Sequence, residues 1–417
     1  PTMLKFESAL DLSSDAIQVQ RQSMLSLHQQ CRAIEQRALD ASSASKEAFE
    51  KRGALLPRER VAALVDPASP FLPLATLAGY LVDDADPATS IPGGSQIAGI
   101  GFVQGVRCMI IATDSAIQAA AMTEAGNLKL MRCQEIALEN RLPFIHLVES
   151  AGANLRKYRV DKFIRGGGIF YNLARLSAAG LPVITSVHGS STAGGAYMPG
   201  LSDYVVMVRQ RARAFLAGPP LLKVATGEIA TAEELGGAEM HATVSGLAEY
   251  VADDDRQAIA LVREVVANLN WNERCAPSGA SSVAGASETT EPPAYPAEEL
   301  MAVMPVETRK PVDMREVLAR IVDGSRWLDF KADYGPATVC GHARIDGKVT
   351  AFITNNGPLD PAGATKAAQF IQLCDQSGTP LVFLQNTTGY MVGSAAEHGG
   401  AIKHGSKMIQ AVANARV

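Results

Sequence analysis

The sequence Gly99-Ile-Gly-Phe-Val-Gln-Gly105, followed by the apolar run Cys108-Met-Ile-Ile-Ala112, has a counterpart in the second half of the chain. The counterpart is Gly341-His-Ala-Arg-Ile-Asp-Gly347, followed by Ala351-Phe-Ile-Thr354, and its two glycines are again six residues apart. Each stretch predicts a β-hairpin, in which two strands flank a tight turn at the second glycine. A repeat of this kind indicates that the chain contains two similar structural units.

The match between the two halves continues downstream. Lys129 precedes Pro143 by 14 residues, and Lys366 precedes Pro380 by 14 residues. Between the members of each pair, apolar residues recur at three- and four-residue spacing, which predicts a helix with one apolar face.

Each proline is followed by a short apolar run, Phe144-Ile-His-Leu-Val148 in the first copy and Leu381-Val-Phe-Leu384 in the second. Such runs are typical of strands that are buried on both faces of a parallel or mixed sheet. Gly152 and Gly389 each lie nine residues after the proline. Since three spacings agree in the same order, we predict two homologous β-β-α-β units in an α/β fold, with His146 as a hydrogen-bonded residue of the first core.

The repeat sets the expected domain limits. Residues 276–300 begin with a stretch rich in Ala, Ser, Gly and Pro, which predicts a linker between domains at 51–275 and 301–417. Residues 1–50 are expected to form a helical segment. In the first copy about 50 residues separate Pro143 from Gly194-Gly195, and the same distance beyond Pro380 passes Val417, so we expect the second domain to be incomplete.

The composition excludes several classes of protein. The 417 residues are 47% hydrophobic and 19% charged with a net charge of -5, and no basic stripe suggests a nucleic-acid partner. No apolar run approaches the length of a membrane span, and the first residues do not resemble a secretion signal. The six cysteines contain no Cys-x-x-Cys pair, which argues against a zinc knuckle and favours a reducing compartment.

The segment Thr185-Ser-Val-His-Gly-Ser-Ser-Thr-Ala-Gly-Gly-Ala-Tyr197 is the main candidate for chemistry. Glycines after a buried strand leave backbone N–H groups open to a ligand, so Gly194 and Gly195 could form an oxyanion hole for a thioester enolate. The alternative is a tight turn that packs closely on a neighbouring strand. No histidine has a serine or cysteine partner in a nucleophile elbow, which suits a reaction whose second substrate supplies the base.

Several longer motifs resemble the carboxyltransferase (β) subunits of biotin-dependent acyl-CoA carboxylases, and they cover the chain from about residue 30. They are Leu56-Pro-Arg-Glu-Arg-Val61, Thr192-Ala-Gly-Gly-Ala-Tyr197, Phe215-Leu-Ala-Gly-Pro-Pro220, Glu234-Leu-Gly-Gly237, Asn386-Thr-Thr-Gly-Tyr-Met-Val-Gly393 and Lys403-His-Gly-Ser-Lys407.

The resemblance implies two tandem crotonase-like (ClpP-like) domains. It also implies an active site between the first domain of one subunit and the second domain of another, and hence a homo-oligomer, expected to be a hexamer in an α6β6 complex. The α subunit would carry biotin, and carboxybiotin would pass CO2 to the acyl-CoA without a metal in this subunit. The expected location is the bacterial cytoplasm, or the mitochondrial matrix in a eukaryote.

The resemblance also implies roles for particular residues. The N–H groups of Gly194 and Gly195 would bind the thioester oxygen, with Ala193, Ala196 and Tyr197 beside the substrate. A second oxyanion hole, for biotin, would lie beyond Val417. Lys129 could contact a CoA phosphate or be a solvated surface lysine. From the second domain, the segment Thr388-Gly389-Tyr390 would line the site.

The predicted substrate depends on Gly166 and Gly167. Methylcrotonyl-type subunits carry a bulky Phe where this chain has Gly166, so its pocket could admit a longer prenyl chain. We therefore expect a geranyl-CoA-like substrate, with methylcrotonyl-CoA as the alternative. A decarboxylase subunit that runs the transfer in reverse, and a non-catalytic scaffold for α subunits, remain further alternatives.

Overall fold

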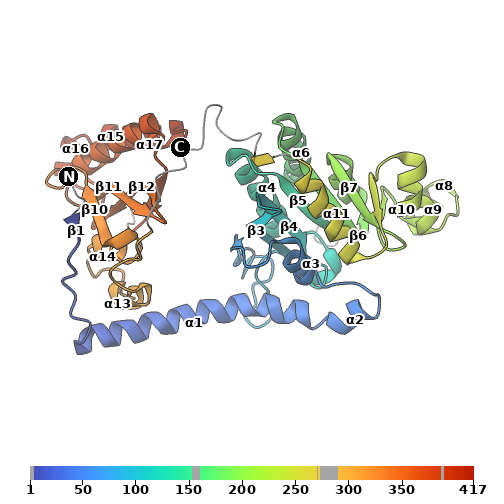
Figure 1. The fold of residues 1–417 in the computed structure, drawn as a ribbon, viewed down its shortest axis with the longest axis horizontal. Coiled ribbons are helices and arrows are strands. Elements are labelled where there is room, and N and C mark those ends of the chain that lie inside the picture. The colour runs from blue at the N-terminus through green and yellow to red at the C-terminus, as the bar shows by residue number, and fades with distance from the viewer. Residues whose placement is uncertain (1–3, 153–159, 270, 273–289, 387–388) are drawn as a thin grey trace. The chain divides into compact units, whose positions relative to one another are not determined.

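The computed structural model describes residues 4–152, 160–269, 271–272, 290–386 and 389–417 (Figure 1). Its contacts divide the chain into two units, Cys31–Gly279 and a unit that joins Pro1–Gln30 to Ala280–Val417. The long helix α1 (Asp15–Ser43) begins in one unit and ends in the other. The sequence did not indicate that the N-terminal residues belong with the second half.

The unit Cys31–Gly279 is built on a mixed sheet (Figure 1). Its strands pair in the order β2-β3-β4-β5-β6-β7-β9, with β8 on β6; β2 to β4 run antiparallel and β4 to β9 parallel. The strands are β2 (Leu72–Pro73), β3 (Gln96–Val103), β4 (Val106–Thr113), β5 (Phe144–Ser150), β6 (Val183–Thr192), β7 (Tyr204–Val208), β8 (Arg213–Phe215) and β9 (Tyr250–Ala252).

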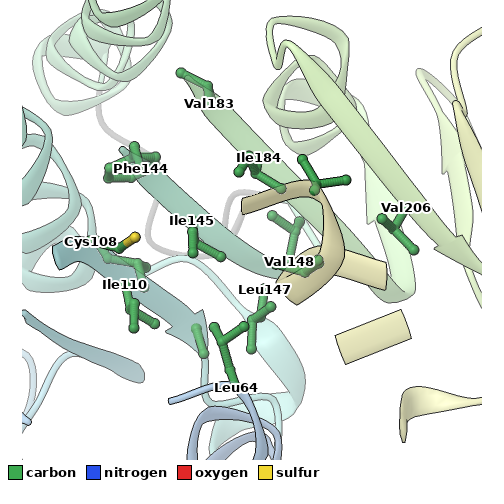
Figure 2. Close-up of a cluster of buried hydrophobic side chains, with 14 of the residues drawn as sticks. Leu64, Cys108, Ile110, Phe144, Ile145, Leu147, Val148, Val183, Ile184 and Val206 are labelled. Atoms are coloured by element: carbon green, nitrogen blue, oxygen red, sulfur yellow. The ribbon is translucent and has the colours of Figure 1, made fainter. Parts of the chain in front are cut away.

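Helices cover this sheet, with α4 packed against α6 and α11 against α3. Figure 2 shows the core between them, where Ile110, Phe144, Ile145 and Val183 are fully buried. The helices are α2 (Lys46–Glu50), α3 (Pro57–Leu64), α4 (Glu124–Glu139), α5 (Val160–Gly166), α6 (Gly168–Ala178), α7 (Tyr197–Gly200), α8 (Pro219–Thr226), α9 (Ala232–Gly236), α10 (Ala238–Met240) and α11 (Asp255–Ala267).

The other unit has a smaller sheet in the order β1-β10-β11-β12-β13. Its strands are β1 (Leu4–Lys5), β10 (Arg326–Asp329), β11 (Thr338–Ile345), β12 (Lys348–Asn355) and β13 (Leu381–Leu384), and its helices are α13 (Leu300–Val303), α14 (Met314–Leu318), α15 (Pro361–Ser377), α16 (Ser394–His398) and α17 (Ala401–Asn414). None of the helices within the described residues is long and apolar enough to cross a membrane.

The predicted repeat is confirmed in both sheets. The hairpins β3–β4 and β11–β12 are antiparallel, and each is followed by a helix and a parallel strand. Both first glycines are required for packing: a Cβ on Gly99 would lie 2.4 Å from the ring of Phe71, and one on Gly341 would lie 2.5 Å from the ring of Trp327.

Both hairpin turns are held by an aspartate that the sequence analysis did not single out. The carboxylate of Asp66 accepts the N–H groups of Gln104 and Gly105 at 2.8 and 2.7 Å. The carboxylate of Asp323 accepts those of Asp346 and Gly347 at 3.0 and 2.7 Å. All four turn residues have positive φ, as a two-residue type I′ hairpin turn requires.

His146 lies in the middle of β5 and is 1% exposed, as predicted for a core residue. The predicted hydrogen bond is absent, because neither ring nitrogen has a partner among the described residues. Burial lowers the pKa of His146 to about 3, so the imidazole is neutral at pH 7.

We predict that His146 makes the protein sensitive to acid. The unfolded chain protonates this side chain near pH 6.5, whereas the folded protein resists protonation until about pH 3, so stability falls as the pH drops through this window. His146→Leu should flatten the dependence of melting temperature on pH between 6.5 and 4, by an amount on the order of 1.4 kcal/mol for each pH unit removed. An unchanged slope in the variant would contradict this assignment.

Candidate active site

The candidate site lies where three parallel strands end. β4, β5 and β6 finish at Thr113, Ser150 and Thr192, and neighbouring parallel strands bring their carboxyl ends to one edge of the sheet. Ligands of open α/β sheets bind at this edge. The glycine segment follows β6 directly and is therefore placed where the sequence analysis needed it.

The glycine segment forms the 3-10 helix Ala193–Ala196, which leads into α7. The first N–H groups of a helix have no partner within it, so those of Gly194 and Gly195 are suited to bind an anion. Ala193 enters this turn with φ of 55°, a left-handed conformation that is strained for a residue with a side chain. Gly194 is exposed and Gly195 is buried.

Gly195 also meets the alternative reading of a closely packed turn. A Cβ at Gly195 would lie 2.6 Å from Oγ and 2.7 Å from Cβ of Ser150. The hydroxyl of Ser191 donates to the carbonyl oxygen of Gly195 at 2.8 Å and fixes the peptide. A Cβ on Gly194 would meet only the ring of Phe170, at 3.5 Å. Close packing and an exposed pair of N–H groups therefore coexist in one turn.

An aromatic pair flanks the turn. Tyr197, which was predicted to line the site, is half exposed, and its ring meets that of Phe170 edge to face with centroids 5.9 Å apart. Phe170 comes from α6 and was not predicted as a site residue. Its signal was present in the sequence, because it follows the glycine cluster at residues 166–168.

The glycine cluster joins two helices. Gly166 ends α5, Gly167 precedes α6, and the N–H of Phe170 donates to the carbonyl of Gly167 at 3.2 Å. A Cβ on Gly166 would have no neighbour within 4 Å, whereas one on Gly168 would lie 2.8 Å from Sδ of Met131. Gly166 therefore faces open space, and Gly168 is needed for helix packing.

Lys129 does not lie at the surface. It is 6% exposed, and its ammonium donates to the backbone carbonyls of Gly93 and Gln96 at 3.2 and 2.7 Å. Burial lowers its pKa to about 8. Both roles weighed from the sequence, a CoA phosphate contact and a solvated lysine, disagree with this burial, because the ammonium is already used to satisfy two carbonyls. Its counterpart Lys366 is fully buried and its ammonium has no hydrogen-bond partner among the described residues.

The residues predicted from the second domain belong to the other unit. The carbonyl of Gly389 accepts the N–H of Leu359 at 3.2 Å, as that of Gly152 accepts the N–H of Met122 at 3.3 Å. Tyr390 is 39% exposed. Thr388 lies outside the described residues.

A cavity of about 480 Å³ adjoins the same strand ends and shares Ser150 with the glycine turn. Beside it, Arg60 is 2% exposed and pairs with Glu149 at 2.8 Å and Asp255 at 3.1 Å. Asp255 also accepts from Nδ1 of His188 at 2.8 Å, which leaves His188 oriented and neutral. Burial lowers the pKa of His188 to about 4. The Leu56–Val61 motif thus holds a structural ion network through Arg60.

The geometry offers backbone N–H donors for an oxyanion and no nucleophile next to a base. Within the described part of the chain, no group of three or more His, Cys, Asp or Glu side chains is arranged to hold a metal ion. The sequence was next compared with known proteins, and the family of the carboxyl transferase domain matches residues 49–417. This chain belongs to that family.

Members of the family with known structures or curated descriptions are similar over most of the chain. The β subunit of P. aeruginosa geranyl-CoA carboxylase is 51% identical with a TM-score of 0.90, covering 99% of this chain and 76% of that one. A probable biotin-dependent acyl-coenzyme A carboxylase β2 subunit of Mycobacterium tuberculosis is 50% identical over 88% of this chain. The mitochondrial methylcrotonoyl-CoA carboxylase β chain of Dictyostelium discoideum is 46% identical over 88%.

The chain spans 66% and 61% of the length of these two curated relatives. The α/β fold of the crotonase type that was predicted from the sequence is confirmed by the match to the family and its solved structure.

We predict that a methyl group at Gly195 disturbs the fold and that one at Gly194 does not. Gly195→Ala would force Ser150 and the turn apart, an overpacking that costs about 1–3 kcal/mol. Thermal unfolding should therefore show a melting temperature lowered by several degrees for Gly195→Ala and unchanged for Gly194→Ala. Equal melting temperatures for the two variants would show that the turn is not closely packed.

Proposed function

We propose that this chain acts as the carboxyltransferase (β) subunit of a biotin-dependent acyl-CoA carboxylase. The observation that carries the proposal is the pair of N–H groups at Gly194 and Gly195, at the carboxyl edge of a crotonase-like sheet in a chain of the carboxyl transferase family. The similar proteins described as acyl-CoA carboxylase β subunits support it.

In this mechanism the chain binds the acyl-CoA with its thioester oxygen at Gly194 and Gly195. These N–H groups donate to the oxygen more strongly as the enolate forms, and one such donor contributes on the order of 3 kcal/mol to lowering the barrier. Carboxybiotin on the α subunit supplies CO2 and then the base that accepts the substrate proton. The site residues fit this role, because His188 is buried, neutral and tied to Asp255 and so does not serve as a base.

The open space at Gly166 supports a long, branched enoyl-CoA as the substrate. A geranyl chain extends further than a methylcrotonyl group, and each buried CH2 favours binding by about 0.8 kcal/mol. The similar solved structure is that of a geranyl-CoA carboxylase β subunit. The curated relatives also include methylcrotonoyl-CoA carboxylases, which makes 3-methylcrotonyl-CoA the second candidate.

The proposed partners are a biotin-carrying α subunit and further copies of this chain, arranged as a β hexamer. Exposed apolar side chains support an oligomer, because large apolar patches usually mark interfaces. On α5 and α8 they include Phe163, Ile164, Leu221 and Val224, which are 58–84% exposed. The proposed location is the cytoplasm of a bacterium, or the mitochondrial matrix in a eukaryote.

The proposed function predicts carboxylation by the full-length β subunit with its biotinylated α partner, ATP and labelled bicarbonate. We expect acid-stable labelled product, with geranyl-CoA preferred over 3-methylcrotonyl-CoA and propionyl-CoA. Absence of product from all three, with an α subunit shown to make carboxybiotin, would contradict the proposal. Preference for a short acyl group would retain the reaction and reject the long substrate.

The role of Gly166 predicts a change of specificity. Gly166→Phe should fill the open space and lower kcat/KM for geranyl-CoA by tenfold or more, with a smaller effect on 3-methylcrotonyl-CoA. Gly200→Phe is a matched control, because a Cβ there also has no neighbour within 4 Å. If Gly166→Phe lowers kcat/KM equally for both substrates, Gly166 does not set the chain length.

A further inference from the structure

Phe170 occupies a distinctive place on α6. The helix buries Ile169, Leu173 and Leu176, which are 0–2% exposed and recur at helical spacing toward the core. Phe170 lies one residue around the helix from this stripe and is only partly buried, while Tyr171 beyond it is 65% exposed. The core therefore does not account for the position of the Phe170 ring, which lies at the boundary with solvent.

The tip of the Phe170 ring is directed at the glycine turn. Its Cζ atom lies 3.5 Å from the point where a side chain on Gly194 would begin, so it fills the space that the missing side chain leaves. The ring of Tyr197 meets it with an interplanar angle of 64°, which holds its orientation. Phe170 therefore stands beside the exposed N–H groups and on the same turn as the proposed thioester site.

The orientation of the ring suits the chemistry. An aromatic ring carries partial positive charge at its edge and negative charge on its faces. Cζ is part of the edge, so the positive rim points toward the place where negative charge would develop on the thioester oxygen. A ring face in this position would repel that charge.

We propose that Phe170 contacts the acyl group of the substrate next to its thioester, with the ring edge against the atoms that become the enolate. This inference rests on the proposed function and adds a residue to its site. It applies to geranyl-CoA and 3-methylcrotonyl-CoA alike, because the contact lies at the thioester end that both share.

The test compares Phe170→Leu with Tyr171→Leu in the full-length β subunit. Leucine keeps an apolar side chain at position 170 and removes the ring edge, whereas Tyr171 is the exposed neighbour on the same helix. Binding of geranyl-CoA, 3-methylcrotonyl-CoA and CoA is measured by calorimetry. Phe170→Leu should weaken both acyl-CoAs about tenfold and leave CoA unchanged, and Tyr171→Leu should change none of them.

A second variant tests the distance. Phe170→Tyr places a hydroxyl on Cζ, where only 3.5 Å separates the ring from the Gly194 position, so it should abolish acyl-CoA binding more completely than leucine while CoA still binds. Carboxylation with the α partner should show the loss in kcat for Phe170→Leu at saturating substrate. Melting temperatures confirm that the variants are folded.

The outcomes separate the two proposals. If the wild-type protein binds acyl-CoA and makes no product, the proposed function fails, while the binding comparison still decides the role of Phe170. If the wild-type protein carboxylates its substrate and the leucine variants at 170 and 171 behave alike, the inference is wrong. Equal weakening of CoA and acyl-CoA by Phe170→Leu would also overturn it, and a wild-type protein that binds neither ligand would overturn both.

Discussion

The candidate site depends on how closely the backbone at Gly195 approaches the side chain of Ser150. There is no room for a Cβ at this point, so the turn after β6 rests directly on the end of β5. The Ser191 hydroxyl holds the Gly195 carbonyl, and Ala193 turns the chain with a left-handed φ. Two N–H groups are thereby fixed in place by backbone packing alone, which is the preorganisation that stabilisation of an oxyanion requires.

A buried ion network supports the same strand ends from below the cavity. Asp255 accepts hydrogen bonds from Arg60, Arg211 and His188, and also from the backbone N–H of Leu55. Removing charges from water is costly unless each is paired, so these groups stabilise the fold only as a set. The network joins α3, α11 and β6, and explains why a motif rich in charge lies in the protein interior.

Much of the fold could be predicted because its signals are local. Paired glycines predicted both hairpins, and apolar runs predicted β5 and β13. Lys129 was misjudged because its helix position gives no sign that two carbonyls from a preceding loop would take its ammonium. Asp66 was missed as a turn partner for a similar reason, since 38 residues separate it from Gln104. Phe170 has no motif of its own, and its importance follows only from the nearby turn.

The two aspartates at the hairpin turns have a consequence for the order in which the chain folds during synthesis. Asp66 is made before its hairpin and Asp323 before the second one, so each turn can close as soon as its own strands have left the ribosome. Arg60, in contrast, waits 195 residues for Asp255. The first unit therefore acquires its strand register early and its charge balance only after α11 emerges, which leaves Arg60 dependent on water through most of translation.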